Sequence, residues 1–380
     1  MDRRHCVLGM GVTMFSVSGC ARSARAPRLE PAGVEPALAR AVSGRATGVV
    51  LAARQGRGSV AVVQGPGDRF GAETVFDLLS IAKFITAVTA LALEERGRFD
   101  LNAPLTRYLP ELPDGFADVT ARKALAHQAG FPANFEIGDD LTVRKAEQAL
   151  AEIIALPRSD KREYRYSNIG PGLVALAIER SERRTFQSVV RGLVFTPAGM
   201  RDTWFFGERG LTTADVAVGR IEGREMGTPA QWPQTWTMFG AAGIAGTIGD
   251  LWRLNRALVS GRLLGREALA RLWVPGASTG GRGPYLHDGL SSTTYGSGLY
   301  HWTDGRGRQV HFHGGDGDFG FHSLMFYRAD DDVFVAGLFN SREDGFERGA
   351  LISAAADALE ATWADTGRGR QPSEERRRRR

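Results

Sequence analysis

The chain has 380 residues, enough for one large core or two lobes, and its composition is that of an ordinary globular protein. Its net charge of +5 does not indicate nucleic-acid binding, because residues 366–380, with seven arginines and two glutamates, hold the whole excess. We expect this Arg-rich tail to be disordered, with attraction to anionic surfaces as the alternative. No basic helix or basic-aromatic stripe occurs elsewhere, so nucleic acid is not an expected partner.

The N-terminus has the pattern of an export signal. Residues 1–20 contain an Arg pair, an apolar run too short to span a bilayer, and small residues at the end. The run VSGC at residues 17–20 resembles a bacterial lipobox, in which the cysteine is lipidated. We therefore predict an exported lipoprotein, anchored through Cys20 on the periplasmic side of the cell envelope, with a plain signal peptide as the alternative. Cys6 is the only other cysteine, so the mature domain has no thiol to pair.

The first half of the chain predicts a hairpin, a buried helix and a helical lobe. Residues 21–45 are rich in Ala, Pro and Arg and are predicted to be a linker. Residues 48–65 place β-branched residues around a Gln-Gly-Arg-Gly turn, which predicts a β-hairpin. Residues 78–93 are apolar on nearly every helical face, which predicts a buried helix that Gly97 ends. Residues 110–225 mix short helical patterns with many breakers, which predicts a loop-rich helical lobe.

The last third of the chain predicts mainly strands. Helical patterns occur at residues 247–264 and 348–364, and four runs between them read as antiparallel strands with Gly- and Asp-rich turns: 295–302, 308–314, 321–329 and 332–340. Strands thus occur at both ends of the chain, with helices between them. We predict an α/β (α+β) domain over residues 46–365, in which an antiparallel sheet built from both chain ends is flanked by helices and joined to the helical lobe.

One lysine is unexpected in the predicted buried helix. Lys83 is the only charged side chain between Leu78 and Leu93, in a chain that has four lysines and 44 arginines. Unlike arginine, a desolvated lysine can lose its proton. Ser80 lies three residues earlier on the same helix face, near the first turn. The pair predicts a nucleophilic hydroxyl beside its general base; the alternative is an N-cap serine with a lysine that reaches the surface.

Residues 78–113 closely resemble the active-site segment of the serine β-lactamase and penicillin-binding-protein-like superfamily. The resemblance is to its class C branch, which includes DD-carboxypeptidases, D-aminopeptidases and family VIII esterases. It covers about residues 45–365 and continues in chain order through five further segments: LAHQAGFP (125–132), YSN (166–168), PAGMRDTWF (197–205), AAGIAGTIGDLWRL (241–254) and HGG (313–315). Each segment is a weak signal alone, but the ordered set is specific. The resemblance implies a β-lactamase/transpeptidase-like fold.

Tyr166 and Asn168 match the Tyr-x-Asn motif of this superfamily. If Tyr166 lies near Lys83, its phenol can share the proton relay, and Asn168 can hold Lys83 or the substrate amide. The alternative is a turn in which the tyrosine belongs to the core. His127, in the second matching segment, is interpreted as a residue that holds its loop.

The HGG segment matches the third motif of the superfamily. By resemblance, His313 replaces a lysine, and it could bind a substrate carboxylate or assist protonation of the leaving group. Gly315 leaves room for a substrate backbone, and the N–H groups of Ser80 and Asp316 form the implied oxyanion hole. His311 lies on the same strand face and is an alternative functional histidine. No carboxylate or cysteine is spaced to complete a metal site with the histidines, so we predict neither a metal nor another cofactor.

The sequence therefore predicts a serine hydrolase that forms an acyl-enzyme on Ser80. Its expected substrates are D-amino-acid peptides, small esters or β-lactams. Peptidase or esterase activity is favoured over efficient β-lactamase activity, because a histidine in the third motif occurs in this superfamily mostly among peptidases and esterases. The alternative is a catalytically silent relative that binds cell-wall peptides or a protein partner. The expected contacts are a small-molecule or peptide substrate and, through Cys20, the membrane; the oligomeric state stays open.

Overall fold

The computed structural model describes residues 28–29, 35–42, 46–63, 68–132, 141–160, 163–208, 216–280, 293–304 and 306–342. The predicted signal peptide with Cys20, the closing helix and the Arg-rich tail lie outside these residues. In the part of the chain that is described, no helix is long and apolar enough to cross a membrane.

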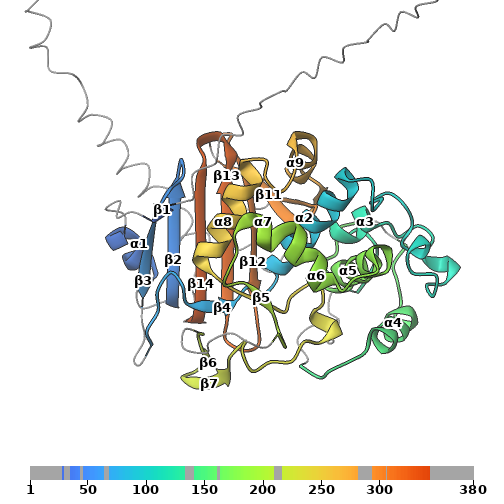
Figure 1. Ribbon diagram of the computed structural model, residues 1–380, viewed down its shortest axis with the longest axis horizontal. Helices are drawn as coiled ribbons and strands as arrows, with labels where there is room; N and C mark the ends of the chain where they lie inside the picture. Colours follow the sequence, from blue (N-terminus) through green and yellow to red (C-terminus); the bar gives the residue numbers. More distant parts are fainter. Residues whose placement is uncertain are drawn as a thin grey trace, which may run out of the picture.

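One large sheet, whose strands come from both ends of the chain, organises the molecule (Figure 1). Its order is β1-β3-β2-β14-β13-β12-β11-β10-β9, and every neighbouring pair is antiparallel except β1 and β3. The bounds are β1 (Arg28–Leu29), β2 (Ala46–Arg54), β3 (Arg57–Val63), β9 (Ala277–Ser278), β10 (Thr294–Gly296), β11 (Leu299–Thr303), β12 (Gln309–Asp316), β13 (His322–Arg328) and β14 (Val333–Arg342). The pairing of β14 with β2 confirms the predicted sheet built from both chain ends.

Part of the segment predicted as a linker is folded, so that prediction is wrong for residues 28–29 and 35–42. β1 pairs with β3, and α1 (Glu35–Val42) contacts β2 and β3 at one edge of the sheet (Figure 1). Pro36 occupies the first turn of α1, where proline is tolerated, and Ala39 packs against buried residues of the sheet. This packing places α1 against the sheet.

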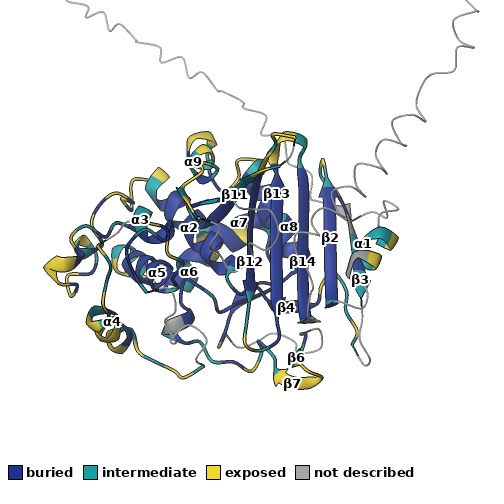
Figure 2. Cartoon of the chain, turned by 180° about the vertical axis from the view of Figure 1, so that it is seen from behind, coloured by how far each residue is buried: buried dark blue, intermediate teal, exposed yellow. Residues whose placement is uncertain are grey.

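The helices other than α1 gather on one face of the sheet and beyond its β11 end, as Figures 1 and 2 show. Helix α2 contacts β12 and β13, while α8 contacts β2 and β14. The α-helices besides α1 are α2 (Ile81–Glu95), α3 (Ala121–Leu125), α4 (Ala146–Ala155), α5 (Ile169–Glu182), α6 (Phe186–Val190), α7 (Thr196–Ala198), α8 (Ile248–Val259) and α9 (Arg266–Leu272). Single-turn elements are η1 (Leu105–Arg107), η2 (Asp114–Phe116), η3 (Arg191–Phe195, a π-helix), η5 (Trp236–Met238) and η6 (Ala329–Asp331).

Two small sheets complete the described elements. One contains β4 (Val75–Asp77), β8 (Ile244–Thr247) and β5 (Trp204–Phe205). In the chain, β4 comes shortly before α2, and β8 comes directly before α8. The other is the hairpin of β6 (Gly219–Ile221) and β7 (Arg224–Gly227), whose tip is exposed (Figure 2).

Helix α2 runs through the centre of the core, and every residue from Ile81 to Leu93 is buried. Its apolar side chains join residues of α5, α8 and the sheet in one cluster, which explains why the sequence is apolar on nearly all helical faces. The helix ends at Glu95, and Gly97 follows in a left-handed conformation with φ +65°, as the sequence predicts. A buried lysine in this helix therefore stands out against its surroundings.

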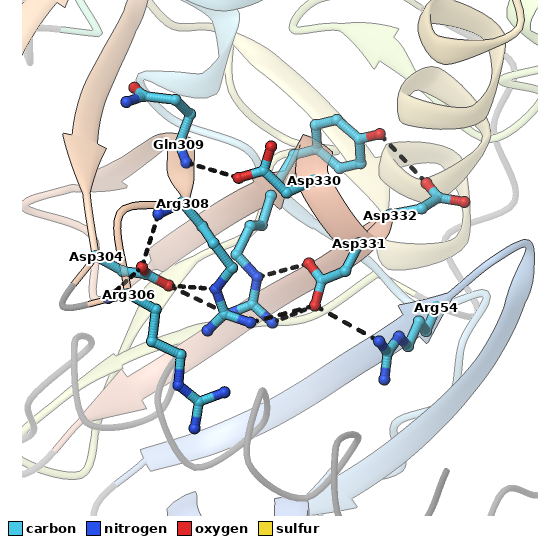
Figure 3. Close-up of polar contacts among 10 residues, drawn as sticks. Arg54, Asp304, Arg306, Arg308, Gln309, Asp330, Asp331 and Asp332 are labelled. Carbon is cyan, nitrogen blue, oxygen red and sulfur yellow. Dashed lines mark hydrogen bonds and ion pairs between the residues drawn. The ribbon is translucent and has the colours of Figure 1, made fainter. Parts of the chain in front are cut away.

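An ion-pair network fastens the turns at one end of the sheet (Figure 3). The buried Arg328 contacts Asp331 and Asp304, and Asp331 also pairs with Arg54 and Arg308. Burial alone would raise the pKa of Asp331, but hydrogen bonds from Arg328 and the surrounding arginine charges lower it below its ordinary value. The network links the β2–β3, β11–β12 and β13–β14 turns.

Candidate active site

Ser80 precedes α2 directly, and Lys83 lies in the first turn of that helix. Nζ of Lys83 donates hydrogen bonds to Oγ of Ser80 at 2.8 Å and to the carbonyl of Ala241 at 2.9 Å. Lys83 is fully buried, so its amine does not reach the surface, and the Ser80 side chain makes no N-cap hydrogen bond. The half-buried Ser80 thus presents its hydroxyl beside an amine that is buried away from solvent. This is the arrangement of a nucleophile with a proton acceptor.

A strained turn sets the position of Ser80. Leu79 has φ +52°, which is uncommon for a leucine, and its N–H donates to Oδ1 of the buried Asp77 at 2.8 Å. The hydroxyl of Ser323 donates to the carbonyl of Leu78 at 2.9 Å. The sequence analysis did not predict these roles of Asp77 and Ser323. An Asx turn at Asp77 is the only local signal, while the contact of Ser323 spans 245 positions.

The end of strand β12 runs against the start of α2. A Cβ atom on Gly315 would lie 2.7 Å from the backbone N of Ser80 and 2.2 Å from Cβ of Leu79, so only glycine fits. The N–H of Gly317 donates to the carbonyl of Phe321, directly after the paired residues Asp316 and His322 of β12 and β13. Along two antiparallel strands, residue pairs that are hydrogen-bonded to each other alternate with pairs that are not. The N–H of Asp316 therefore points away from β13. This backbone placement is what an oxyanion hole requires.

Gly315 faces the start of α2. Because neighbouring residues of a strand face opposite sides, the side chain of Asp316 points away from α2. Its Oδ1 accepts a hydrogen bond from Nδ1 of His322, at 2.6 Å. This side-chain pair joins β12 to β13 at the point where the two strands approach Ser80. The backbone of Asp316, and not its side chain, is therefore the candidate part of the site.

The structure brings Tyr166 to Lys83. Nζ of Lys83 lies 5.0 Å from the centre of the Tyr166 ring, and the tyrosine is half-buried. Asn168 is the N-cap residue of α5, two residues further along; it is also half-buried and makes no side-chain cap hydrogen bond. Tyr166 and Asn168 come from the helical lobe, whereas Ser80 and Lys83 come from the central helix, so the site lies where the two parts meet.

His313 is fully buried in a cluster of aromatic residues beside Tyr166. Its Nδ1 donates to the carbonyl of Gly314 at 2.8 Å, so in the neutral ring Nε2 accepts from the hydroxyl of Tyr295 at 3.0 Å. Burial, together with the neighbouring amine of Lys83, lowers the pKa of His313 to about 3. A neutral imidazole engaged on both nitrogens does not suit the carboxylate-binding role that the sequence suggested. Its described contacts instead make it a neighbour of Tyr166 that is hydrogen-bonded to Tyr295.

His311 belongs to a different group of side chains. Its Nδ1 lies 2.8 Å from Nδ1 of His301, and its ring stacks on Trp273 at 4.4 Å between centroids. Burial and the neighbouring His301 lower its pKa to about 3. Of the two candidate histidines, His313 is the one beside Tyr166. Among the residues described, no group of three or more His, Cys, Asp or Glu side chains could hold a metal ion.

Residues 28–360 match the family model described as Beta-lactamase. The chain therefore belongs to the beta-lactamase family. Among curated proteins it is similar to the esterase EstB of Burkholderia gladioli, with 29% identity over 182 residues, 41% of this chain and 46% of that protein. It is also similar to penicillin-binding protein 4* of Bacillus subtilis, with 27% identity over 148 residues, 36% of this chain and 32% of that protein. The chain spans about half the length, or less, of the curated relatives it matches.

Solved structures share the fold. A D-amino acid amidase from Ochrobactrum anthropi superposes with a TM-score of 0.73 at 20% identity, covering 87% of this chain and 99% of the other. A class C beta-lactamase mutant superposes with a TM-score of 0.70 at 15% identity, covering 87% and 97%. The predicted fold, a β-lactamase/transpeptidase-like α/β domain, is confirmed.

Proposed function

We propose that this protein is a serine hydrolase that forms an acyl-enzyme on Ser80. The observation that carries the proposal is the 2.8 Å hydrogen bond between Oγ of Ser80 and Nζ of the buried Lys83, with the ring of Tyr166 5.0 Å from the same amine. A hydroxyl, an amine and a phenol within reach of one another form a nucleophile with a proton relay. Membership of the beta-lactamase family supports this function.

In the proposed reaction, Oγ of Ser80 attacks the substrate carbonyl carbon while its proton passes to the Lys83–Tyr166 pair. The N–H groups of Ser80 and Asp316 stabilise the negative oxygen of the tetrahedral intermediate. The bond to the leaving nitrogen or oxygen then breaks as that atom takes the proton from the pair. Water then attacks the acyl carbon while the pair takes one of its protons. The bond between that carbon and Oγ of Ser80 breaks, Oγ takes the proton from the pair, and the acid is released.

Amides of D-amino acids or their peptides and small esters are the favoured substrates, and β-lactams are the weaker candidates. A β-lactam antibiotic carries a carboxylate next to the scissile amide, and His313, at the position of the family's lysine, is neutral and fully buried. The likeness to an esterase and the fold shared with a D-amino acid amidase support the same preference. Asn168, at the rim of the site, is suited to hydrogen-bond a substrate amide.

The test is a panel of three chromogenic substrates: p-nitrophenyl butyrate, D-alanine p-nitroanilide and nitrocefin. Each is assayed with the wild type and with Ser80→Ala. We expect turnover of the ester and the anilide, slow or no turnover of nitrocefin, and loss of all activity in Ser80→Ala. If the wild type hydrolyses none of them and a fluorescent fluorophosphonate does not label it, the protein is a silent binder.

We also propose, from the sequence of residues 1–20, that the protein is exported and lipid-anchored at Cys20. Metabolic labelling with palmitate in a bacterial host tests this proposal. Incorporation into the wild type and its loss in Cys20→Ser are expected. Equal labelling of both proteins, or of neither, contradicts a lipid anchor at this cysteine.

A further inference from the structure

One residue outside the predicted catalytic set holds the chain on both sides of Tyr166. The backbone carbonyl of His127 accepts a hydrogen bond from Arg165 N–H at 2.8 Å. Nδ1 of the same histidine accepts a hydrogen bond from Ser167 N–H at 3.2 Å. The residues immediately before and after Tyr166 are therefore both bound to His127, which belongs to a separate segment of the chain.

The imidazole also packs against the phenol. The ring centroids of His127 and Tyr166 are 4.4 Å apart, and the ring of Tyr295 lies 4.6 Å from His127 on a further contact. His127 is buried and has φ +57°, a left-handed conformation that few residues other than glycine adopt. A backbone held in this conformation turns both the carbonyl and the ring of His127 toward the same short segment.

The hydrogen bonds also fix the protonation state of the ring. Because Nδ1 accepts from a backbone N–H, the neutral ring carries its proton on Nε2. Burial, with Lys83 and His313 as close neighbours, keeps the pKa of His127 well below its ordinary value. Nε2 has no hydrogen-bond partner among the described residues. The backbone N–H of His127 donates to the carbonyl of Ala124 at 3.2 Å, and its two described acceptors, the backbone carbonyl and Nδ1, both serve the segment that carries Tyr166.

We propose that His127 is a positioning residue for Tyr166, which it fixes against the amine of Lys83. The proposal rests on the proposed function, in which Tyr166 shares the proton of Ser80. The ring contributes an acceptor and a packing surface. It adds no positive charge next to Lys83. Substrate contact is not part of this role, so His127 acts through Tyr166.

Two substitutions separate the hydrogen bond from the bulk of the ring. In His127→Asn the side-chain oxygen takes the place of Nδ1, and asparagine tolerates a positive φ. In His127→Leu the bulk remains but the acceptor is lost, and the positive φ at this position is less favourable than with asparagine. His311→Leu is the matched control, because it also removes a buried imidazole from the fold, but one that stacks on Trp273. Thermal unfolding of each variant checks that it is folded.

Crystal structures of the wild type and the two His127 variants provide a readout that is independent of activity. The centre of the Tyr166 ring should stay about 5.0 Å from Nζ of Lys83 in the wild type and in His127→Asn. It should move away, or lose its density, in His127→Leu. A Tyr166 ring that keeps its place in a folded His127→Leu protein overturns the proposal, whatever the enzyme is found to hydrolyse.

Kinetics in two backgrounds provide the second readout. We expect His127→Leu to lower kcat/KM about 100-fold, mainly through kcat, and His127→Asn and His311→Leu to change it less than about 5-fold. In the Tyr166→Phe background the same leucine substitution should change kcat/KM less than about 3-fold, because the effect passes through the missing hydroxyl. Equal losses in both backgrounds would mean a merely structural role. An inactive wild type refutes the proposed function, while the crystallographic comparison still decides the placement of Tyr166.

Discussion

The carbonyl of Ala241 accepts a hydrogen bond from Nζ of Lys83 at 2.9 Å and directs the amine toward Ser80. The preceding carbonyl, of Gly240, accepts from the hydroxyl of Thr86 one helical turn further along α2, at 2.7 Å. Two consecutive carbonyls thus hold one side of the helix. Because Lys83 is fully buried, its polar contacts, and not the solvent, decide where its amine lies.

The first prediction concerns the buried amine of Lys83. Replacement by methionine keeps the length of the side chain and removes the proton acceptor, so kcat/KM should fall at least about 1,000-fold. The melting temperature should stay the same or rise, because a buried polar group is exchanged for an apolar one. Lys123→Met, which removes a partly buried lysine bound to the carbonyl of Asp118, is the control and should keep full activity. Near-normal turnover in Lys83→Met excludes the proton relay.

The second prediction concerns the contact between β12 and α2. In Gly315→Ala the new methyl group would lie 2.7 Å from the backbone N of Ser80, so β12 must move away from the helix. We expect kcat/KM to fall about 100-fold as the two oxyanion donors separate. Gly115→Ala, where a methyl group meets nothing within 4 Å, should behave as the wild type. Equal activity of both variants argues against an oxyanion hole at this contact.

The third prediction concerns the turn before Ser80. Asp77→Ala removes the acceptor for Leu79 N–H, which should lower the free energy of unfolding by about 1–2 kcal/mol and kcat about 10-fold. Asp77→Asn keeps an oxygen at the same place and should lose much less of both. Chemical denaturation and steady-state kinetics measure the two effects. If asparagine and alanine are equally harmful, the negative charge matters and the hydrogen bond does not.

The fourth prediction concerns stability at acid pH. Burial lowers the pKa of His301 to about 4 and that of His311 to about 3. Between these values and the ordinary 6.5, the unfolded chain binds protons that the folded protein does not, so stability rises with pH. Each histidine should therefore cost about 1 kcal/mol of unfolding free energy between pH 6.5 and 5.5, because the unfolded imidazole goes from half to mostly protonated over this interval. His311→Leu should flatten this dependence by about that amount in urea titrations; an unchanged slope contradicts a neutral buried His311.

Local patterns in the sequence predict much of the fold and one part of the site, the pair of Ser80 and Lys83. Helix α2, the β2–β3 hairpin and the C-terminal strands follow from spacing within one element, as does the approach of Ser80 to Lys83. The meeting of Lys83 with Tyr166 depends on tertiary packing, and only the family resemblance anticipated it. His127 was expected only to hold its loop. Its two hydrogen bonds around Tyr166 become visible only when separate segments are assembled.

The most direct test of the account is the mass of the intact protein after brief exposure to an activated ester or a fluorophosphonate. A nucleophilic Ser80 predicts one covalent adduct per chain, located by peptide mapping on the peptide that contains Ser80, and its absence in Ser80→Ala. In Lys83→Met the adduct should form at least about 100-fold more slowly. An adduct on another residue, or equal labelling of wild type and Ser80→Ala, contradicts acyl transfer through Ser80.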